Sequence, residues 1–522
     1  MSSNAAANEE ATRGAFSSRK VFILAAVGSA VGLGNIWRFP YVAYDSGGGA
    51  FLLPYLVALL TAGIPFLFFD YAIGHRYRGS APLSFTRAGG RKAEGLGWWQ
   101  FGICFVIAVY YAAVIAWAIR YTFFSVGKQW GEDTEAFFFE DFLQVADGVS
   151  LDFVPGVLVP LLIVWLVVLG VLALGVQRGV GASAVVFIPI LVVVFGFLVI
   201  RALFLPGAAS GLEQFFRPDW GALLDASVWA AAYGQIFFSL SIGFGIMITY
   251  ASYVRRRSDM SGSGLVVGFA NSGFELLAGI GVFAVLGFMS QAAAVPVDEV
   301  LGEGGVGLAF VAFPAIINEA PAGSLIGLLF FASLILAGLT SLISITEVQI
   351  AAVREKFELS RVTATLAVGV PGAVISLLLF STTTGLPVLD IVDNFINRFG
   401  ILVVAVASML VVAWGLRLLP ALTDHLNHSG SVPIGTWWWV LVGGLTPAVL
   451  TFVLVNYLVE TLQEPYGGYP QWMLLTFGWG VAIGVLVLGL LAALAPWKPT
   501  TSLEVPPDSP AVSAAGGKEK RP

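Results

Sequence analysis

The chain has 522 residues, of which 58% are hydrophobic and only 11% are charged. Soluble domains typically carry about 45–50% apolar and about 25% charged residues, so this composition excludes an ordinary soluble protein. The net charge of −6, with no basic patch interleaved with aromatic residues, argues against nucleic acid as a ligand. We therefore expect an integral protein of the lipid bilayer.

Apolar segments long enough to cross a bilayer recur along the whole chain. A transmembrane helix needs about 20 predominantly apolar residues. Segments of about this size fall at 21–44, 51–73, 98–124, 154–174, 181–204, 228–253, 264–289, 325–353, 363–380, 388–416, 437–458 and 472–494. The pattern predicts an all-α integral membrane protein with about 12 transmembrane helices.

The charged residues of the connecting segments predict the orientation. Arginine and lysine concentrate before the first span and after the second, fourth, sixth and eighth, which all lie on one side. The connection after the third span instead holds seven acidic residues and the single Lys128. Because positive residues stay inside, we expect a multi-pass protein of the cell membrane with both termini cytoplasmic. Residues 1–18 lack the hydrophobic region of a signal peptide, so we expect the first span to be a retained helix. The composition of 497–522 predicts a disordered tail.

Two spans contain small and polar residues at mid-membrane depth. The first reads GSAVGLGN over 28–35, and the sixth reads FSLSIGFG over 238–245. One interpretation is close packing of helices through small residues. The other is a pair of discontinuous helices with a solute site between them, because the interruptions lie five spans apart, as an inverted repeat of five helices requires. The residues that could ligate a cation there are neutral oxygen donors, although buried hydroxyls commonly bond back to their own helix.

Four motifs resemble those of the neurotransmitter:sodium symporter family. They read GLGNIWRFP at 32–40, GGGAF at 47–51, QIFFSLS at 235–241 and AGLTS at 337–341. Among members, the resemblance is greatest to bacterial symporters of hydrophobic amino acids. It implies a 5+5 inverted repeat with discontinuous helices 1 and 6. The expected division is a cytoplasmic segment over 1–18, repeats over 19–206 and 207–418, helices 11 and 12 over 419–496, and the tail over 497–522.

The resemblance implies two sodium sites and no organic cofactor. Sodium 1 would be held by the carbonyl of Ala30 and the side chains of Asn35, Ser239 and Asn271, with the substrate carboxylate. Sodium 2 would be held by carbonyls of Gly28, Val31 and Ala337 and hydroxyls of Thr340 and Ser341.

The resemblance also implies a substrate pocket. Its lining would be Ser29, Ala30, Ile107, Tyr111, Phe238, Ser239, Ser241, Phe244, Ser341 and Ile345. Tyr111 would donate its hydroxyl to the substrate carboxylate. Relatives that carry monoamines have aspartate in place of Gly32, so glycine here favours a ligand with its own carboxylate. The apolar lining favours a neutral, hydrophobic amino acid.

Charged residues complete the implied machinery. Glu275 replaces the bound chloride of chloride-dependent relatives and is expected near Tyr55, Gln235, Ser239 and Asn271. Arg38 and Asp393 resemble the outer gate pair. Arg13 and Glu355 resemble the inner gate pair, with Tyr253 nearby.

We therefore predict a sodium-coupled, chloride-independent symporter of neutral amino acids that works by alternating access as a monomer or weak homodimer. It is not expected to be an enzyme, because no nucleophile–base–orienter set is discernible. A non-transporting amino acid sensor with the same fold is the main alternative, and an ion channel is a weaker one. Cys104 is the single cysteine, and the three histidines lack the spacing of a metal site.

Overall fold

The computed structural model describes residues 15–146, 150, 152–293, 307–320 and 322–505. Its helices from the first half of the chain are α2 (Arg19–Ala30), α3 (Leu33–Asp45), α4 (Leu52–Ala58), α5 (Ile64–Tyr77), α6 (Ala81–Gly89), α7 (Glu94–Gly127), α8 (Thr134–Ala136), α9 (Pro155–Ala173), α10 (Ala182–Leu203), α11 (Ala208–Phe216), α12 (Ala226–Ser239) and α13 (Ile246–Ser252). Short π-helical turns join several of them, such as α4 to α5 through Leu59–Gly63.

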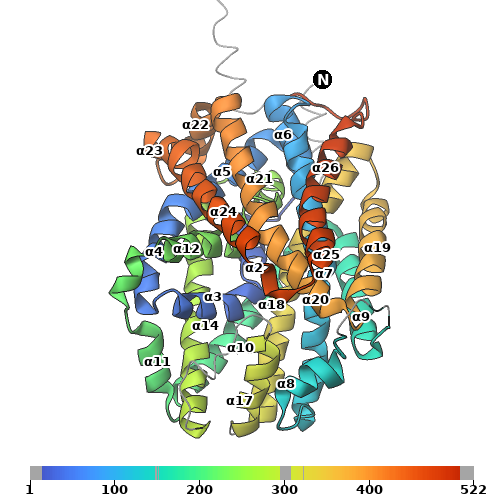
Figure 1. Ribbon diagram of the computed structural model, residues 1–522. Coiled ribbons are helices and arrows are strands. Elements are labelled where there is room, and N and C mark those ends of the chain that lie inside the picture. The colour runs from blue at the N-terminus through green and yellow to red at the C-terminus, as the bar shows by residue number, and fades with distance from the viewer. Residues whose placement is uncertain (1–14, 147–149, 151, 294–306, 321, 506–522) are drawn as a thin grey trace, which may run out of the picture.

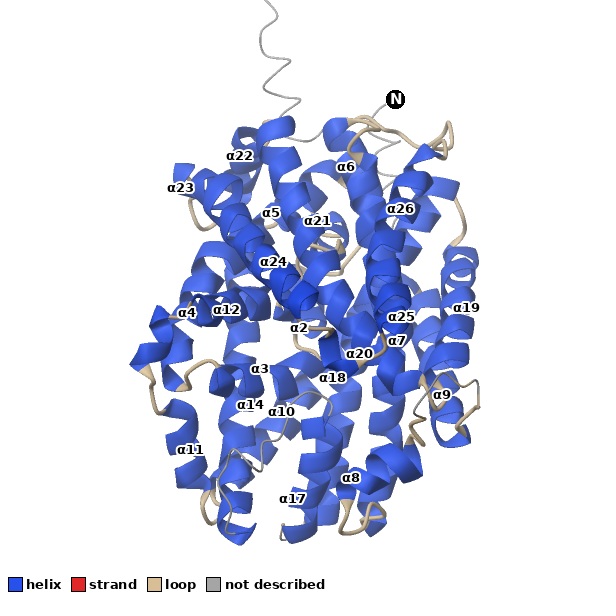
Figure 2. Cartoon of the chain, viewed as in Figure 1, coloured by secondary structure: helices blue, strands red, loops and turns tan. Residues whose placement is uncertain are grey.

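The second half contributes α14 (Met260–Ala293), α17 (Phe313–Glu319), α18 (Gly323–Phe357), α19 (Arg361–Phe380), α20 (Gly385–Phe395), α21 (Leu402–Leu410), α22 (Leu419–Ser429), α23 (Thr436–Val440), α24 (Thr446–Gln463), α25 (Gln471–Met473) and α26 (Gly480–Leu494). Figure 2 shows helices joined by loops, and the described chain contains no strand. Figure 1 places α6 and α22 at one end of the bundle and α8 and α17 at the other. We call these ends the α6 side and the α17 side.

The number of spans agrees with the sequence. Within the described ranges, ten helices are long and apolar enough to cross a membrane. The first and sixth predicted spans are not among those ten because each is split, into α2 with α3 and α12 with α13. Together they account for the twelve predicted spans, and the all-α class is confirmed. Large apolar side chains on the outside, such as Leu166, Val193 and Leu488, are 63%, 70% and 66% exposed, as lipid-facing residues would be.

Both helix interruptions occur where the sequence predicted them. Helix α2 ends because Val31 adopts extended dihedral angles (φ −75°, ψ 94°), and α3 begins after Gly32, which is also extended. Between α12 and α13, Ser241, Gly243 and Gly245 have φ of 52°, 86° and 89°. Glycine reaches positive φ without steric cost, which explains why the unwound segment reads SIGFG. The predicted discontinuous helices 1 and 6 are confirmed.

Neighbouring helices hold the unwound segment 240–245. The Gly243 amide donates to Asp70 Oδ2 at 3.3 Å, and the Cys104 thiol donates to the Phe244 carbonyl at 3.1 Å. Ser241 Oγ donates to the Ser29 carbonyl at 2.9 Å, which joins one interruption to the other. Backbone groups without helical partners therefore find them in side chains, as buried peptide groups in a membrane must.

The last described residues correct one prediction. Composition predicted disorder from residue 497 onward, but the structure describes residues 497–505, and Trp497 among them is only 8% exposed. The reason is that Trp497 makes specific contacts in the folded protein. The average composition of a proline- and serine-rich segment does not reveal the contacts of a single residue. Residues 506–522 lie outside the described ranges.

Candidate functional site

The two helix interruptions open onto one cavity of about 1130 Å³. All ten residues that the sequence placed in the substrate pocket line this cavity. It extends from there toward the α17 side, where α8 and α17 contribute to its wall. Long helices α7 and α18 add Ile107, Tyr111, Ser341 and Ile345 to the wall formed by the broken helices. Helices from both predicted repeats therefore meet at this one place.

A chain of amide and hydroxyl groups connects the residues assigned to sodium 1. Asn35 Nδ2 donates to Asn271 Oδ1 at 2.9 Å, and Asn271 Nδ2 donates to Ser239 Oγ at 3.0 Å. Asn35 Oδ1 also accepts from the Gly32 amide at 2.8 Å. All three side chains are buried. Since their oxygens are neutral and hard, they are suited to a small alkali cation.

The residues assigned to sodium 2 lie where the end of α2 meets α18. Ser341 Oγ donates toward the Gly28 and Ser29 carbonyls at 3.5 and 3.2 Å, and Thr340 Oγ1 donates to the Ala337 carbonyl at 2.9 Å. Val31, which ends α2, is 2% exposed. The five assigned residues thus belong to one helix end and one facing helix.

A small space remains beside Gly32. A Cβ atom on Gly32 would lie 3.0 Å from both Tyr111 Oη and Ser341 Oγ. The Leu33 amide donates to Tyr111 Oη at 3.1 Å, so this tyrosine sits at the N-terminus of α3. Helix N-termini carry partial positive charge and free amides, which attract carboxylates. The space is therefore lined by two hydroxyls and the positive end of a helix.

Apolar side chains form the walls beyond this space. Ile107, Phe244 and Ile345 are 6%, 4% and 5% exposed. The guanidinium of Arg38 lies 4.4 Å from the centroid of the Phe238 ring, on the α17 side of the pocket. A ligand with one carboxylate and one apolar side chain would match this separation of polar and apolar walls.

Glu275 is fully buried on α14, one helical turn after Asn271. Gln235 Nε2 donates to its Oε1 at 2.6 Å, and the Tyr55 hydroxyl donates to its Oε2. Two of the four neighbours expected for Glu275 are thus direct partners. A third, Asn271, lies on the same face of α14 and also contacts Ser239, the fourth.

The charged residues assigned to the outer gate line the cavity but are not paired with each other. Asp393 accepts from the Tyr110 hydroxyl at 2.6 Å and from Asn397 Nδ2 at 2.8 Å. Among the ion pairs of the described chain, none joins Arg38 to Asp393. Because they stay apart, the cavity remains continuous toward the α17 side.

Polar contacts close the α6 side. Glu355 Oε2 accepts from the amide and hydroxyl of Ser80 at 2.9 and 2.7 Å. The Tyr253 hydroxyl donates to Glu347 Oε1 at 2.8 Å, and Arg361 forms two hydrogen bonds to the same carboxylate. Arg13, the expected partner of Glu355, lies outside the described residues.

Comparison with known proteins identifies the family. A profile described as the sodium:neurotransmitter symporter family matches residues 13–133 and 128–498. The chain belongs to this family.

Relatives support the assignment over nearly the full length. An uncharacterized sodium-dependent transporter of Methanocaldococcus jannaschii is 42% identical over 462 residues, which cover 88% of this chain and 93% of the relative. The human sodium- and chloride-dependent GABA transporter 2 is 31% identical, with coverage of 91% and 85%. The crystal structure of MhsT in complex with L-phenylalanine matches this chain with a TM-score of 0.71 and 32% sequence identity. The match covers 85% of this chain and 99% of the MhsT chain. The predicted family is therefore confirmed.

Two features of this symporter were missed by the sequence reasoning. One is the pair of Glu347 and Arg361, although a glutamate inside the predicted span 325–353 was a usable signal. The other is a contact between His75 and His425, whose ring nitrogens Nδ1 and Nε2 lie 2.8 Å apart. These histidines are 4% and 9% exposed rather than solvated, because α22 packs against α5. Among the described residues, no three His, Cys, Asp or Glu side chains lie together as a metal site of that kind would require.

Proposed function

We propose that this member of the family is a sodium-coupled symporter that imports neutral, hydrophobic L-amino acids by alternating access. The observation that carries the proposal is the space beside Gly32. It lies between two hydroxyls and the N-terminus of α3, and it opens onto apolar walls. Such a space fits a carboxylate joined to an apolar side chain.

Sodium would couple to the substrate through its carboxylate. With Asn35, Asn271 and Ser239 in contact beside the N-terminus of α3, a cation there would be near the carboxylate space. A bound amino acid would supply the negative charge that this neutral ligand set lacks. Sodium 2, between α2 and α18, would stabilise the interruption of the first broken helix. The two ions would thus stabilise the conformation in which both broken helices line the substrate site.

The substrate class rests on the walls and on one relative. Ile107, Phe238, Phe244 and Ile345 offer no charged group to a substrate side chain. MhsT, whose structure this chain resembles, was solved with L-phenylalanine. We expect leucine-like or aromatic amino acids to be transported. Uptake dominated by glycine or charged amino acids would contradict this part of the proposal.

Chloride independence rests on Glu275. Its carboxylate accepts hydrogen bonds from Tyr55 and Gln235, which are donors that a chloride ion could also use. A fixed negative charge in this place would remove the need for a bound anion. The carboxylate is also a candidate to carry a proton when the empty carrier returns.

Alternating access gives the two ends different roles. We propose that the α17 side faces outward, in line with the acidic connection after α7, and that the α6 side faces the cytoplasm. The present arrangement, with the cavity continuous toward the α17 side, would admit substrate and sodium. Approach of Arg38 and Asp393 would close it, and separation of the contacts around Glu355 and Glu347 would release the cargo.

The decisive experiment is uptake of radiolabelled L-leucine and L-phenylalanine into proteoliposomes. An inward sodium gradient is compared with potassium and choline, and chloride is replaced by gluconate in a parallel series. Uptake that requires sodium and ignores chloride supports the proposal. Sodium-dependent binding without uptake, in sealed vesicles, would instead favour the amino acid sensor.

A further inference from the structure

A second polar centre lies on the α6 side, away from the substrate cavity. Its core is an ion pair between Glu94, at the start of α7, and Lys356, near the end of α18. Both side chains are completely buried. A buried ion pair is stable only when further hydrogen bonds compensate the loss of water. The groups that donate these hydrogen bonds to the ion pair therefore indicate the role of this polar centre.

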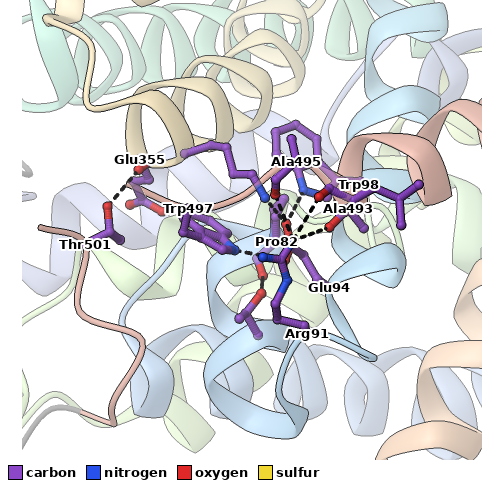
Figure 3. Close-up of polar contacts among 12 residues, drawn as sticks. Pro82, Arg91, Glu94, Trp98, Glu355, Ala493, Ala495, Trp497 and Thr501 are labelled. Carbon is purple, nitrogen blue, oxygen red and sulfur yellow. Dashed lines mark hydrogen bonds and ion pairs between the residues drawn. The ribbon is translucent and has the colours of Figure 1, made fainter. Parts of the chain in front are cut away.

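Two tryptophans complete the shell of Glu94, as Figure 3 shows. Trp98 Nε1 donates to Glu94 Oε1 at 2.9 Å, and Trp497 Nε1 donates to Oε2 at 2.9 Å. The ammonium of Lys356 also lies 4.5 Å from the centroid of the Trp497 ring. Trp497 follows the last transmembrane helix, so the post-helical segment itself covers the ion pair and supplies both a hydrogen bond and a cation–π contact.

Further contacts hold the same segment, residues 495–502, along the α6 side. Arg91 donates to the carbonyls of Ala493 and Ala495 at 2.8 Å each. Arg87 donates to the Ser502 carbonyl at 2.7 Å through Nη2, and Thr501 Oγ1 lies 3.4 Å from the Glu355 carbonyl. We call residues 495–502 the strap. It crosses the end of α6 and the start of α7, which are neighbours in the sequence, and the distant end of α18.

The strap connects two groups of helices. Arg87, which holds its Ser502 end, also donates to the Tyr77 and Arg78 carbonyls at 2.9 and 2.7 Å, where α5 ends. Helix α5 packs tightly on α13, the second half of a broken helix. Trp497, in contrast, is fixed to α7 and α18. The strap therefore ties the end of α5, and through it α13, to the pair α7–α18.

We infer that the strap is a cytoplasmic latch that holds the α6 side closed, and that Trp497 must leave the Glu94–Lys356 pair before this side opens fully. The inference rests on the alternating-access function proposed above. It also assigns a role to the end of the chain, because any ligand or modification that pulls Trp497 away would favour opening toward the cytoplasm.

The test measures opening directly. Ala251, which is fully buried on α13, is replaced by cysteine in a Cys104→Ser background, which retains a hydrogen-bond donor to Phe244 and leaves one reporter thiol. The rate of thiol alkylation is measured in detergent with saturating sodium. Trp497→Ala should raise it roughly tenfold or more, the factor expected for losing a hydrogen bond to a charged group. Trp497→Phe, which keeps a ring over Lys356, should give a smaller increase.

Matched variants separate a latch from simple destabilisation. Trp472→Ala, at the opposite end of the last span, removes a half-exposed indole and should leave the rate unchanged. In a Glu94→Leu/Lys356→Met background, Trp497→Ala should add less than a twofold change, because both the acceptor of its hydrogen bond and the charges it covers are gone. A chain ending at Thr501 loses only the Arg87 contact with the strap and tests the same inference if Trp497→Ala does not fold.

Two results would overturn the inference. One is that folded Trp497→Ala is alkylated at the same rate as the protein with Trp497. The other is that Trp497→Ala raises the alkylation rate by the same factor whether or not the Glu94–Lys356 pair is present. The readout needs no transport substrate. Absence of sodium-dependent uptake would therefore refute the proposed function while the effect of the strap on accessibility could still be measured.

Discussion

Replacing Gly32 by alanine tests where the substrate carboxylate binds. Gly32 has φ −122° and ψ −167°, an extended conformation open to any L-residue, so alanine adds no backbone strain. The new methyl group would instead lie 3.0 Å from Tyr111 Oη and Ser341 Oγ. This is closer than carbon normally approaches a hydroxyl oxygen, so both hydroxyls must move away. The methyl would also occupy the space proposed for the carboxylate.

The expected loss follows from these contacts. Overpacking a well-filled site typically costs about 1–3 kcal/mol. Losing one hydrogen bond to a charged group costs about 1.5–3 kcal/mol more when the substrate is bound. At about 1.4 kcal/mol per factor of ten, even the smaller contributions add to a decrease in affinity of roughly 50-fold or more. Folding should change less than binding, because Tyr111 and Ser341 line the cavity and have room to shift into it.

Equilibrium binding of radiolabelled L-leucine to purified protein in sodium would measure this loss. Gly196→Ala is the matched control, because its Cβ would have no atom within 4 Å. Thermal midpoints of all three proteins would show that they are folded. If Gly32→Ala bound leucine with wild-type affinity, the carboxylate could not lie between Tyr111 and Ser341, and the proposed position of the substrate in the cavity would be wrong.

Three further perturbations have defined outcomes. Glu275→Ser should make sodium-dependent uptake require chloride, because Gln235 would then lack its anionic partner; equal uptake in gluconate would reject the assignment. Gly74→Ala should reduce the yield of folded protein, since its Cβ would lie 1.9 Å from the Ile248 carbonyl oxygen, whereas the Gly196 control should express normally. Burial and nearby positive charge lower the pKa of His425 from 6.5 to about 2, so its neutral form contributes fully above pH 6.5 and about 2 kcal/mol is lost by pH 5. The thermal midpoint should therefore fall between pH 7.5 and pH 5, and His425→Gln should show a shallower decline.

Much of the site could be predicted because its chemistry depends on local sequence. Glycines and serines in the first and sixth spans, five spans apart, predicted two discontinuous helices, and the structure interrupts both helices at those residues. The residue types of the pocket also sit in short motifs, such as AGLTS over 337–341. Their spacing along α2, α12 and α18 then determines which side chains face the cavity.

Contacts between distant segments could not be predicted in this way. His75 and His425 are 350 residues apart, and nothing near either of them indicates the other. Which ring nitrogen of this histidine pair donates and which accepts can be inferred only from the structure. His75 Nε2 faces the Arg255 carbonyl, which can only accept, so His75 Nδ1 must accept from His425 Nε2. Trp497 is a similar case, because its partner Glu94 lies 403 residues earlier.

The shape of the unwound segments depends on side chains of the intact helices as much as on the sequence motifs of the broken ones. Segment 240–245 lacks regular helical hydrogen bonds, so its shape depends on side chains from outside. On α7, Cys104 donates to the Phe244 carbonyl, while Ile107 and Tyr111, three and seven residues further on, line the pocket. A spacing of three to four residues keeps these side chains on one face of the helix. The same rigid face therefore fixes the unwound backbone and shapes the pocket, which allows a flexible, glycine-rich segment to present Phe244 in one position to a substrate.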